Sequence, residues 1–335
     1  MKVLVTGGAG FIGSALIKLW LRLDPTISII NLDKLTYCGD LDRLKELKGN
    51  PRHRFVQADI CDAKAVEKAM DGCSVVVHLA AESHVDRSLL EGKVFIDTNV
   101  NGTYVLLETA RKKGIQKYLQ VSTDEVYGSR PKGYFIEKDP LHPSSPYSVS
   151  KAAGDLLALS YVSTHGLPVV VTRGSNTFGP YQYPEKVIPL FVSNALGGKN
   201  LPLYGDGRQI RNWIYVEDHC RGILHALKKG KAGEIYNISS NTELENIVLT
   251  RLILKTLSKS ETMIEPVKDR LGHDRRYAIN SSKLRALGWK EKHSFDTAFR
   301  STVLWYRDHE AWWQAIKQKQ EGFQSYYAKA YGKKF

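Results

Sequence analysis

Short apolar runs alternate with longer amphipathic stretches along the first half of the chain. The apolar runs predict strands at residues 2–6, 27–32, 54–57, 74–78, 118–121 and 168–172. Between them, apolar residues at spacings of one, three and four predict a helix from about residue 15 and others over 63–70, 95–113 and 147–164. The regular alternation of strand and helix predicts a parallel sheet with helices on both faces.

The pattern becomes less regular after about residue 175, where we expect loops rich in proline, glycine and aromatic residues. This change predicts an α/β fold in which a doubly wound parallel sheet carries a smaller C-terminal lobe for a substrate. We expect residues 1–177 to form the sheet domain, rejoined by about residues 209–238. Residues 178–208 and 239–335 are expected to form the lobe.

The N-terminus, the length of the apolar runs and the cysteine spacing indicate where the protein is located and whether it binds a metal. No apolar run approaches the ~20 residues of a membrane-spanning helix, and Met1 and Lys2 lead directly into the first strand rather than into a signal peptide. The four cysteines show neither CxxC pairing nor metal-like spacing with the histidines. We therefore expect free thiols, no metal site and a reducing, cytoplasmic location.

The balance of charges favours an anionic partner but does not identify it. The chain has 48 lysine and arginine residues against 35 aspartate and glutamate residues, a net charge of +13. Such a charge attracts nucleic acids, anionic membranes or small anions. However, the basic residues lie in short groups, such as 111–113 and 228–231, that are typical of solvated helix faces. We expect neither a nucleic-acid partner nor a membrane partner.

Glycines at positions 7, 10 and 13 separate the first predicted strand from the first predicted helix. Glycine there lets the backbone turn tightly and approach a pyrophosphate, which a helix N-terminus attracts. Asp33 lies 33 − 13 = 20 residues after the last glycine, a spacing typical of a carboxylate that binds a ribose 2′-hydroxyl. A carboxylate repels the 2′-phosphate of NADP, so the sequence predicts an NAD-binding domain of the Rossmann type. Asp59 is expected beside the adenine, although it fits a helix cap equally well. The expected cofactor contacts are Gly7, Gly10, Phe11, Ile12, Gly13, Asp33, Asp59, Ile60, Ala80, Ala81, Tyr147 and Lys151.

Two further motifs bring titratable side chains to strand and helix ends. Tyr147 and Lys151 are four residues apart and share one face of a predicted helix. A lysine ammonium group stabilises a tyrosinate, which makes Tyr147 a candidate base. Residues 122–128, STDEVYG, follow a strand in a sheet whose carboxyl ends line the ligand crevice. A hydroxyl and two carboxylates are costly to desolvate without a function, although an exposed turn with a helix cap has the same composition.

These motifs belong to longer stretches of sequence, here called shared words. Through them, the chain resembles the extended short-chain dehydrogenase/reductases and, within them, the dTDP-glucose 4,6-dehydratases. TGGxGFIG and YxxxK mark only the superfamily. TDE at residues 123–125 is more specific, because related epimerases carry small residues after the Ser or Thr. The shared words run nearly end to end: TGGAGFIGS (6–14), LDKLTY (32–37), HLAAESHVDRS (78–88), STDEVYG (122–128), YSVSK (147–151), GPYQYPEKVIPL (179–190), YGDGRQIRNWIYVEDH (204–219) and DRLGHDRRYAI (269–279).

The resemblance implies a lyase that uses NAD with no net redox change and converts dTDP-glucose to dTDP-4-keto-6-deoxy-glucose, a step of deoxysugar biosynthesis. It implies that Tyr147, assisted by Thr123 and Lys151, deprotonates the C4 hydroxyl while hydride leaves C4 for NAD. The 4-keto group acidifies C5–H, which Glu125 removes while Asp124 protonates the departing C6 hydroxyl, and hydride returns to C6. Successive strand residues face opposite ways, so the two carboxylates must lie past the strand end.

The resemblance also implies how the substrate binds and how the chain assembles. Lys186, Arg211 and Arg270 suit a diphosphate, and Tyr204 is expected to stack on the base. A homodimer is expected through a four-helix interface formed by residues 95–113 and 147–164, with an apolar stripe on their surface. The substrate is expected to be a nucleotide-diphosphate sugar in contact with Ser83, His84, Asn176, Lys186, Tyr204, Arg211, Asn246, Arg270 and His273.

The chain departs from the family pattern at two places. Residues 173–181 read RGSNTFGPY where the family usually has RCSNNYGPY, and residues 211–213 read RNW in place of RDW. These changes leave UDP-glucose, or another hexose on dTDP, open as the substrate. A nucleotide-sugar 4-epimerase or decarboxylase is a further alternative, although an epimerase has no use for an acid at Asp124. A different class is an NAD-binding regulatory protein without activity.

Overall fold

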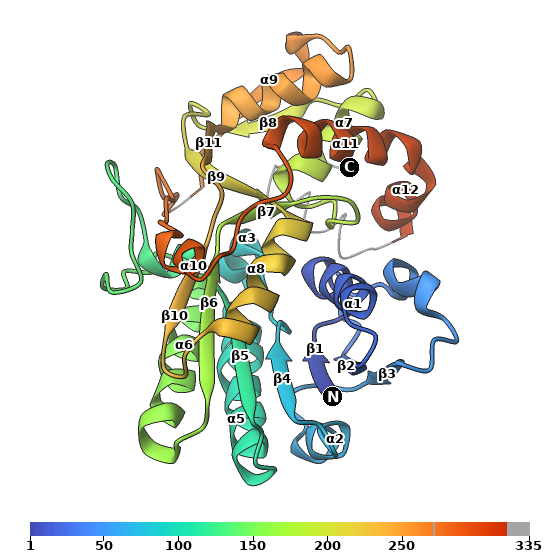
Figure 1. Cartoon of the computed structure of the whole chain (residues 1–335). Helices are drawn as coiled ribbons and strands as arrows, with labels where there is room; N and C mark the ends of the chain where they lie inside the picture. Colours follow the sequence, from blue (N-terminus) through green and yellow to red (C-terminus); the bar gives the residue numbers. More distant parts are fainter. Residues whose placement is uncertain (271, 320–335) are drawn as a thin grey trace.

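A computed structural model describes residues 1–270 and 272–319, and its centre is a parallel sheet of seven strands. The strand order is β10-β6-β5-β4-β1-β2-β3, and every neighbouring pair is parallel. Figure 1 shows these strands side by side in the lower half of the molecule. The predicted doubly wound sheet is therefore confirmed. The strands are β1 (Lys2–Thr6), β2 (Ser28–Asp33), β3 (His53–Gln57), β4 (Val75–His78), β5 (Lys117–Thr123), β6 (Val169–Gly174) and β10 (Ile235–Ile238).

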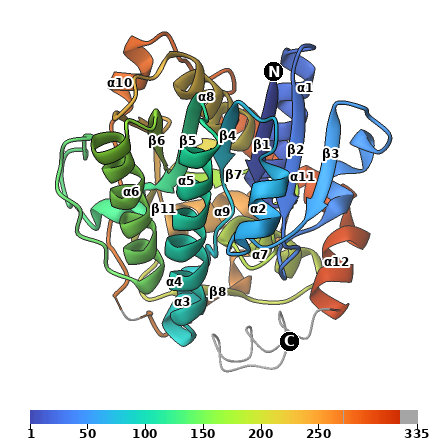
Figure 2. The same ribbon diagram turned by 90° about the horizontal axis from the view of Figure 1, so that it is seen from below.

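Each central strand buries both of its faces. Val3 and Val5 of β1 belong to one apolar cluster, whereas Leu4 between them belongs to another. The first cluster joins the sheet to α1 (Phe11–Leu23) and α8 (Val216–Lys229), which pack together on one face. The second joins it to α2 (Ala63–Ala69), α5 (Thr103–Lys112) and α6 (Pro146–His165) on the other face (Figure 2). Strands buried on both faces read as continuous apolar runs, which is the pattern that predicted them.

The predicted helix over residues 95–113 is divided in the structure. A short helix α4 (Lys93–Ile96) runs into a π-helical turn at Asp97–Gly102 before α5 begins. Within this turn, the Asn99 amide donates to the Glu82 carbonyl at 2.9 Å and to Ser150 Oγ at 2.8 Å. Such bonds to distant segments are not visible in local apolar periodicity, so the sequence pattern predicted one continuous helix.

The expectation of loops after residue 175 is wrong, because this region forms most of a well-structured lobe. The lobe contains two small sheets, ordered β11-β9-β7 and β12-β8, and a separate apolar cluster. Its strands are three to six residues long and pair across large sequence separations, so no local period reveals them. The elements are β7 (Asn176–Phe178), α7 (Val187–Leu196), β8 (Leu201–Tyr204), β9 (Ile210–Tyr215), β11 (Thr242–Glu245), α9 (Asn246–Thr256), β12 (Ile264–Val267), α11 (Phe295–Asp308) and α12 (Glu310–Lys319).

The chain crosses between sheet and lobe more than once. After β9, helix α8 packs on α1, and β10 adds an edge strand to the large sheet. Helix α10 (Ser282–Ala286) contributes Leu284 to the same cluster as α1 and α8, and Trp289 follows it there. We propose the domain division given above, with residues 281–289 moved from the lobe to the sheet domain. Residues 320–335 of the predicted lobe lie outside the described part.

Within the described ranges, no helix combines the length and the apolar character that crossing a bilayer requires.

Candidate active site

The carboxyl ends of β1, β4, β5 and β6 line a cavity of about 430 Å³ to which the lobe also contributes. The ends of parallel strands share one edge of a sheet, so residues far apart in sequence meet there. The cavity walls include all of the residues predicted as cofactor, catalytic or substrate contacts: Gly7, Gly10, Phe11, Ile12, Gly13, Asp33, Asp59, Ile60, Ala80, Ala81, Ser83, His84, Thr123, Asp124, Glu125, Tyr147, Lys151, Asn176, Lys186, Tyr204, Arg211, Asn246, Arg270 and His273.

The glycine loop leaves backbone space at the start of α1. A Cβ atom on Gly13 would lie 2.2 Å from the Gly7 carbonyl oxygen, and Gly7 itself has a φ of +73°. Gly10 is different, because a Cβ there would meet only the Gly7 oxygen at 3.2 Å, and Gly10 lines the cavity. The helix begins at Phe11 without a side-chain cap. This loop fits a pyrophosphate, which needs close backbone approach and uncapped N–H groups.

Asp33 is held rigidly at the end of β2. Its Oδ2 accepts a hydrogen bond from the Ala9 N–H at 2.9 Å, and its Oδ1 accepts one from the Leu35 N–H at 2.8 Å. Each carboxylate oxygen has a second lone pair, so both can still accept from ribose hydroxyls. The position and the remaining acceptor capacity suit NAD.

The cap interpretation of Asp59 is wrong. Helix α2 is capped by Asp62, which accepts from two backbone N–H groups. Asp59 instead pairs with Lys34 at 2.7 Å and accepts from the Cys61 N–H at 2.9 Å. Although burial opposes it, these partners lower the pKa of Asp59.

Asp124 and Glu125 lie immediately past the end of β5, as the sequence geometry required. Strand β5 ends at Thr123, and a 3-10 turn over Asp124–Tyr127 (η3) follows. The Thr123 hydroxyl donates to Asp124 Oδ1 at 3.3 Å and accepts from the Glu125 N–H at 3.2 Å. Asp124 is 2% exposed, and its Oδ2 has no partner among the described residues. A buried acceptor without a partner is costly, which points to a role toward a ligand.

The two carboxyl groups differ in their electrostatic surroundings. Burial and the charge of Glu125 raise the pKa of Asp124 to about 8. Burial also raises the pKa of Glu125, but Arg270, Lys186 and Arg211 oppose that rise. The pair therefore favours a protonated Asp124 beside an ionised Glu125, which is an acid beside a base.

Tyr147 and Lys151 lie on α6 against the end of β5. The Lys151 ammonium donates to the Val121 carbonyl at 2.8 Å, and burial lowers the pKa of Lys151 to about 8. Burial and the charge of Glu125 raise the pKa of Tyr147, while Thr123 lowers it. Phe95 packs edge-on against the Tyr147 ring at 6.3 Å between centroids.

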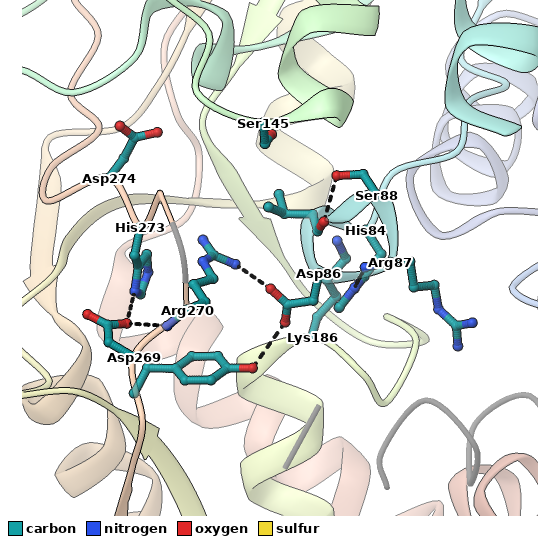
Figure 3. Close-up of polar contacts among 12 residues, drawn as sticks. His84, Asp86, Arg87, Ser88, Ser145, Lys186, Asp269, Arg270, His273 and Asp274 are labelled. Carbon is teal, nitrogen blue, oxygen red and sulfur yellow. Dashed lines mark hydrogen bonds and ion pairs between the residues drawn. The ribbon is translucent and has the colours of Figure 1, made fainter. Parts of the chain in front are cut away.

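Three cationic side chains line the lobe end of the cavity. Lys186 donates to the Ser83 carbonyl at 2.9 Å, and Arg211 donates to the Asp274 carbonyl at 3.0 Å. Arg270 pairs with the Asp86 carboxylate at 3.0 Å (Figure 3). Such a cluster suits a diphosphate, because arginine offers several N–H groups in fixed directions.

The other predicted substrate contacts come from both halves of the fold. His84 caps α3 (Val85–Leu90), and burial lowers its pKa to about 4. Asn176 begins β7 and Asn246 begins α9. His273 Nδ1 donates to Asp269 Oδ1 at 2.6 Å (Figure 3), and the His273 ring meets the Tyr204 ring edge-on.

Two of the four departures from the family pattern, Phe178 and Asn212, concern packing, and the other two lie on the cavity wall. Phe178 lies in the lobe core, with aromatic contacts that include Trp213 and Phe299. Asn212 is buried and bonded to the Ser240 carbonyl at 2.9 Å. Gly174 and Thr177 do line the cavity, and Thr177 contacts the His219 ring at 2.7 Å.

Three polar residues of the cavity wall that the sequence did not single out contact other polar side chains there. Asp86 holds Arg270, while the buried Glu185 accepts from the Tyr37 hydroxyl at 2.8 Å and the Arg87 guanidinium at 2.9 Å. The Arg211 guanidinium lies 4.1 Å from the centre of the Tyr277 ring. Asp86, Glu185 and Tyr277 all lie within the shared words, but nothing local distinguished them from ordinary surface residues.

Comparisons with known proteins agree with this geometry. A family model described as GDP-mannose 4,6 dehydratase matches residues 4–302. The chain is 46% identical over 326 residues to a dTDP-glucose 4,6-dehydratase of Streptomyces niveus, covering 96% of this chain and 97% of that protein. A dTDP-glucose 4,6-dehydratase of Streptomyces venezuelae, solved with NAD and dTDP bound, superposes with a TM-score of 0.93 at 47% identity, covering 95% of this chain and 100% of that one.

A more distant structure shows how widely the fold is shared. The UDP-glucose 4-epimerase of Thermus thermophilus, in complex with NAD, is 30% identical and superposes with a TM-score of 0.85, covering 92% of this chain and 100% of that one. The higher identity to the dehydratases agrees with the acid and base at the end of β5. The chain therefore belongs to the GDP-mannose 4,6-dehydratase family and, within it, to the group of the dTDP-glucose 4,6-dehydratases.

Proposed function

We propose that the protein is an NAD-dependent hydro-lyase that converts dTDP-glucose to dTDP-4-keto-6-deoxy-glucose. The observation that carries this proposal is the carboxyl pair at the end of β5: Asp124 is buried with an oxygen unpartnered within the described ranges and a pKa raised to about 8, while three cations oppose the rise that burial causes in the pKa of Glu125. Elimination of water needs an acid for the departing hydroxyl and a base for the adjacent C–H. An epimerase needs neither.

NAD fits the residues that line the sheet end of the cavity. The glycine loop would receive the pyrophosphate, Asp33 would bind the adenosine ribose, and Asp59, Ile60, Ala80 and Ala81 would lie along the adenosine. Lys151 would bond the nicotinamide ribose. When bound, NAD accepts hydride from C4 and later supplies it to C6, so no external reductant is needed.

The side chains of the protein carry out four proton transfers. Tyr147, aided by Thr123 and Lys151, removes the proton of the C4 hydroxyl. Glu125 then removes the C5 proton, which the new 4-keto group has made acidic. Asp124 gives its proton to the C6 hydroxyl, which leaves as water, and Glu125 returns its proton to C5 as C6 receives hydride. The sum is the loss of one water molecule, and the proton taken by Tyr147 returns to Asp124 through solvent.

The remaining contacts are proposed for the nucleotide and sugar. Lys186, Arg211 and Arg270 supply positive charge for the diphosphate at the lobe end of the cavity. Tyr204 is proposed to stack on the base, and the other contacts are Ser83, His84, Asn176, Asn246 and His273.

Mass spectrometry of dTDP-glucose and UDP-glucose, incubated separately with the purified protein and no added reductant, tests the proposal. Loss of one water from dTDP-glucose alone is the expected result. Loss from UDP-glucose alone would reassign the nucleotide. An unchanged mass with a new isomer on chromatography would indicate an epimerase, and no change at all would indicate a protein that binds NAD without this activity.

We also propose a homodimer and a cytoplasmic location. Figure 2 shows α3, α4, α5 and α6 along one side of the molecule. These helices carry half of the large apolar side chains that are exposed in the described residues, which supports an interface there. The exposed apolar residues on these helices are Leu89, Leu90, Ile96, Tyr104, Val149 and Leu156.

The cysteines support the proposed cytoplasmic location. All four are free thiols, which suits a reducing compartment.

A further inference from the structure

Asp86 connects the two halves of the molecule at the lobe end of the cavity. It lies in the first turn of α3, on the sheet side, and its Oδ1 accepts from Arg270 Nη1 at 3.0 Å. Its Oδ2 accepts from the Tyr204 hydroxyl at 3.2 Å. Tyr204 ends β8, and Arg270 follows β12, the strand that pairs with β8. One carboxylate thus holds two side chains of the lobe that both face the cavity.

Hydrogen bonds hold the Arg270 backbone as well as its guanidinium group. Asp269 accepts from the Arg270 N–H at 2.9 Å, from Gln209 Nε2 at 2.9 Å, and contacts His273 Nδ1 at 2.6 Å. Figure 3 shows Asp269 and Asp86 on opposite sides of Arg270, one near its backbone and one at its guanidinium group. A side chain fixed at both ends loses little rotamer freedom when it binds a ligand.

The Arg270 guanidinium keeps hydrogen-bonding capacity for a ligand. A guanidinium group has five N–H donors. Asp86 accepts from Nη1, and the buried Nε has no partner among the described residues. Arg270 and Arg211 also repel each other across the cavity, as the effect of Arg270 on the pKa of Arg211 shows. Although burial opposes it, the Asp86 carboxylate raises the pKa of Arg270 and offsets this repulsion.

We infer that Asp86 is a positioning residue that fixes the Arg270 guanidinium in the orientation that receives the diphosphate of the substrate, an assignment that rests on the proposed function. Asp86 itself does not bind the substrate. It acts through Arg270, in the way that outer partners orient the ligands of a metal ion.

Neutralising Asp86 tests the inference, because a positioning role and simple electrostatics predict opposite changes in dTDP binding. Removing a negative charge near a bound anion strengthens binding if charge alone matters. If Asp86 orients Arg270, the Asp86→Asn variant binds dTDP about tenfold more weakly, because a charge-assisted hydrogen bond that orders the arginine is lost. The KM for dTDP-glucose rises by the same factor, while kcat stays within about twofold.

A double-mutant cycle shows whether Asp86 acts through Arg270. In an Arg270→Gln background, Asp86→Asn is expected to change dTDP binding by less than about twofold, because the residue that it positions is gone. Calorimetric titration with dTDP measures binding for all four proteins. The matched control is Glu261→Gln, which breaks the exposed pair between Arg251 and Glu261 outside the cavity and leaves dTDP binding unchanged.

Tighter or unchanged dTDP binding by Asp86→Asn would overturn the inference, and so would an effect that adds fully to that of Arg270→Gln. A lower melting temperature with normal KM would show that Asp86 is only a structural link. If Asp86→Asn does not fold, the smaller neutral Asp86→Ser carries the same test. Turnover by the wild-type protein tests the proposed function separately, since the cycle needs only dTDP binding.

Discussion

Asp124 and Glu125 are chemically similar and adjacent, yet their neighbours separate their protonation. Asp124 is enclosed and accepts a hydrogen bond from the Thr123 hydroxyl, and burial and the charge of Glu125 raise its pKa. Glu125 faces the cations of the lobe, which favour its ionised form. The adjacency alone suggested an acid and a base, but only the lobe decides which is which. Its cations come from residues 60 or more positions later in the chain.

Substitution of each carboxyl should stop the reaction at the same stage by different means. Asp124→Asn loses the acid for the C6 hydroxyl, and Glu125→Gln loses the base for C5–H. Each is expected to lower the rate of water loss by roughly 10²- to 10⁴-fold while C4 oxidation persists. Single-turnover absorbance of reduced nicotinamide, compared with water loss by mass spectrometry, measures both steps. Full turnover by either variant would show that its role is assigned wrongly.

The pH dependence should show loss of activity on the alkaline side. Asp124 must be protonated to act as the acid, and burial and Glu125 raise its pKa to about 8. Since deprotonation removes the acid, kcat is expected to fall as pH rises through this value. Burial also lowers the pKa of Lys151 to about 8, which weakens C4 oxidation over the same range. A pH–rate profile measures this, and a kcat that increased above pH 8 would contradict both assignments.

At the scale of elements, the turn between β1 and α1 uses its glycines for two different purposes. A Cβ on Gly13 would meet the Gly7 backbone at 2.2 Å, so glycine there serves the fold. A Cβ on Gly10 would meet only one atom at 3.2 Å, so glycine there serves the cavity. The sequence motif cannot separate these two reasons, because it records only the residue type.

A pair of alanine variants distinguishes the two glycines. Gly13→Ala is expected to lower the melting temperature, because the crowding costs about 1–3 kcal/mol. Gly10→Ala is expected to keep nearly the wild-type melting temperature but to weaken NAD binding by roughly tenfold, or ~1.4 kcal/mol. Thermal unfolding and NAD titration of both proteins check this. Equal losses of stability and NAD affinity in the two variants would remove the distinction.

The sequence predicts those elements whose pattern is local. The central strands of residues 2–174 are predicted because both of their faces are buried, as Val3, Leu4 and Val5 show. The strands of the lobe were missed because β8 pairs with β12 some 60 residues away, and pairing at that range leaves no local period. The glycine loop, Asp33 and the carboxyl pair were predicted from motifs at strand ends, whereas the substrate contacts came from the family resemblance. Asp86 was not predicted, since its importance depends on Arg270 lying 184 residues away.

At the scale of the whole molecule, the exposed apolar side chains on α5 and α6 should mark a subunit interface. Leu156 is 60% exposed and Tyr104 is 52% exposed. Leu156→Asp places a charge in that interface, so we expect a shift from a dimer to a monomer of 37.7 kDa in sedimentation analysis. Leu23→Asp is the matched control, because Leu23 is 51% exposed at the end of α1 on the other face. A dimer that survives Leu156→Asp would place the interface elsewhere.

The position of β10 at the edge of the large sheet also bears on how the chain is made. This strand pairs with β6, yet 60 residues that include four lobe elements and α8 separate the two in sequence. During synthesis, β6 therefore emerges from the ribosome long before its outer neighbour exists. Its N–H and C=O groups, along an apolar stretch from Val169 to Val171, remain an open edge until residue 238 has been added. A nascent chain that stalls in this interval presents a template for pairing with another chain, which makes the interval the stage of biosynthesis most exposed to aggregation.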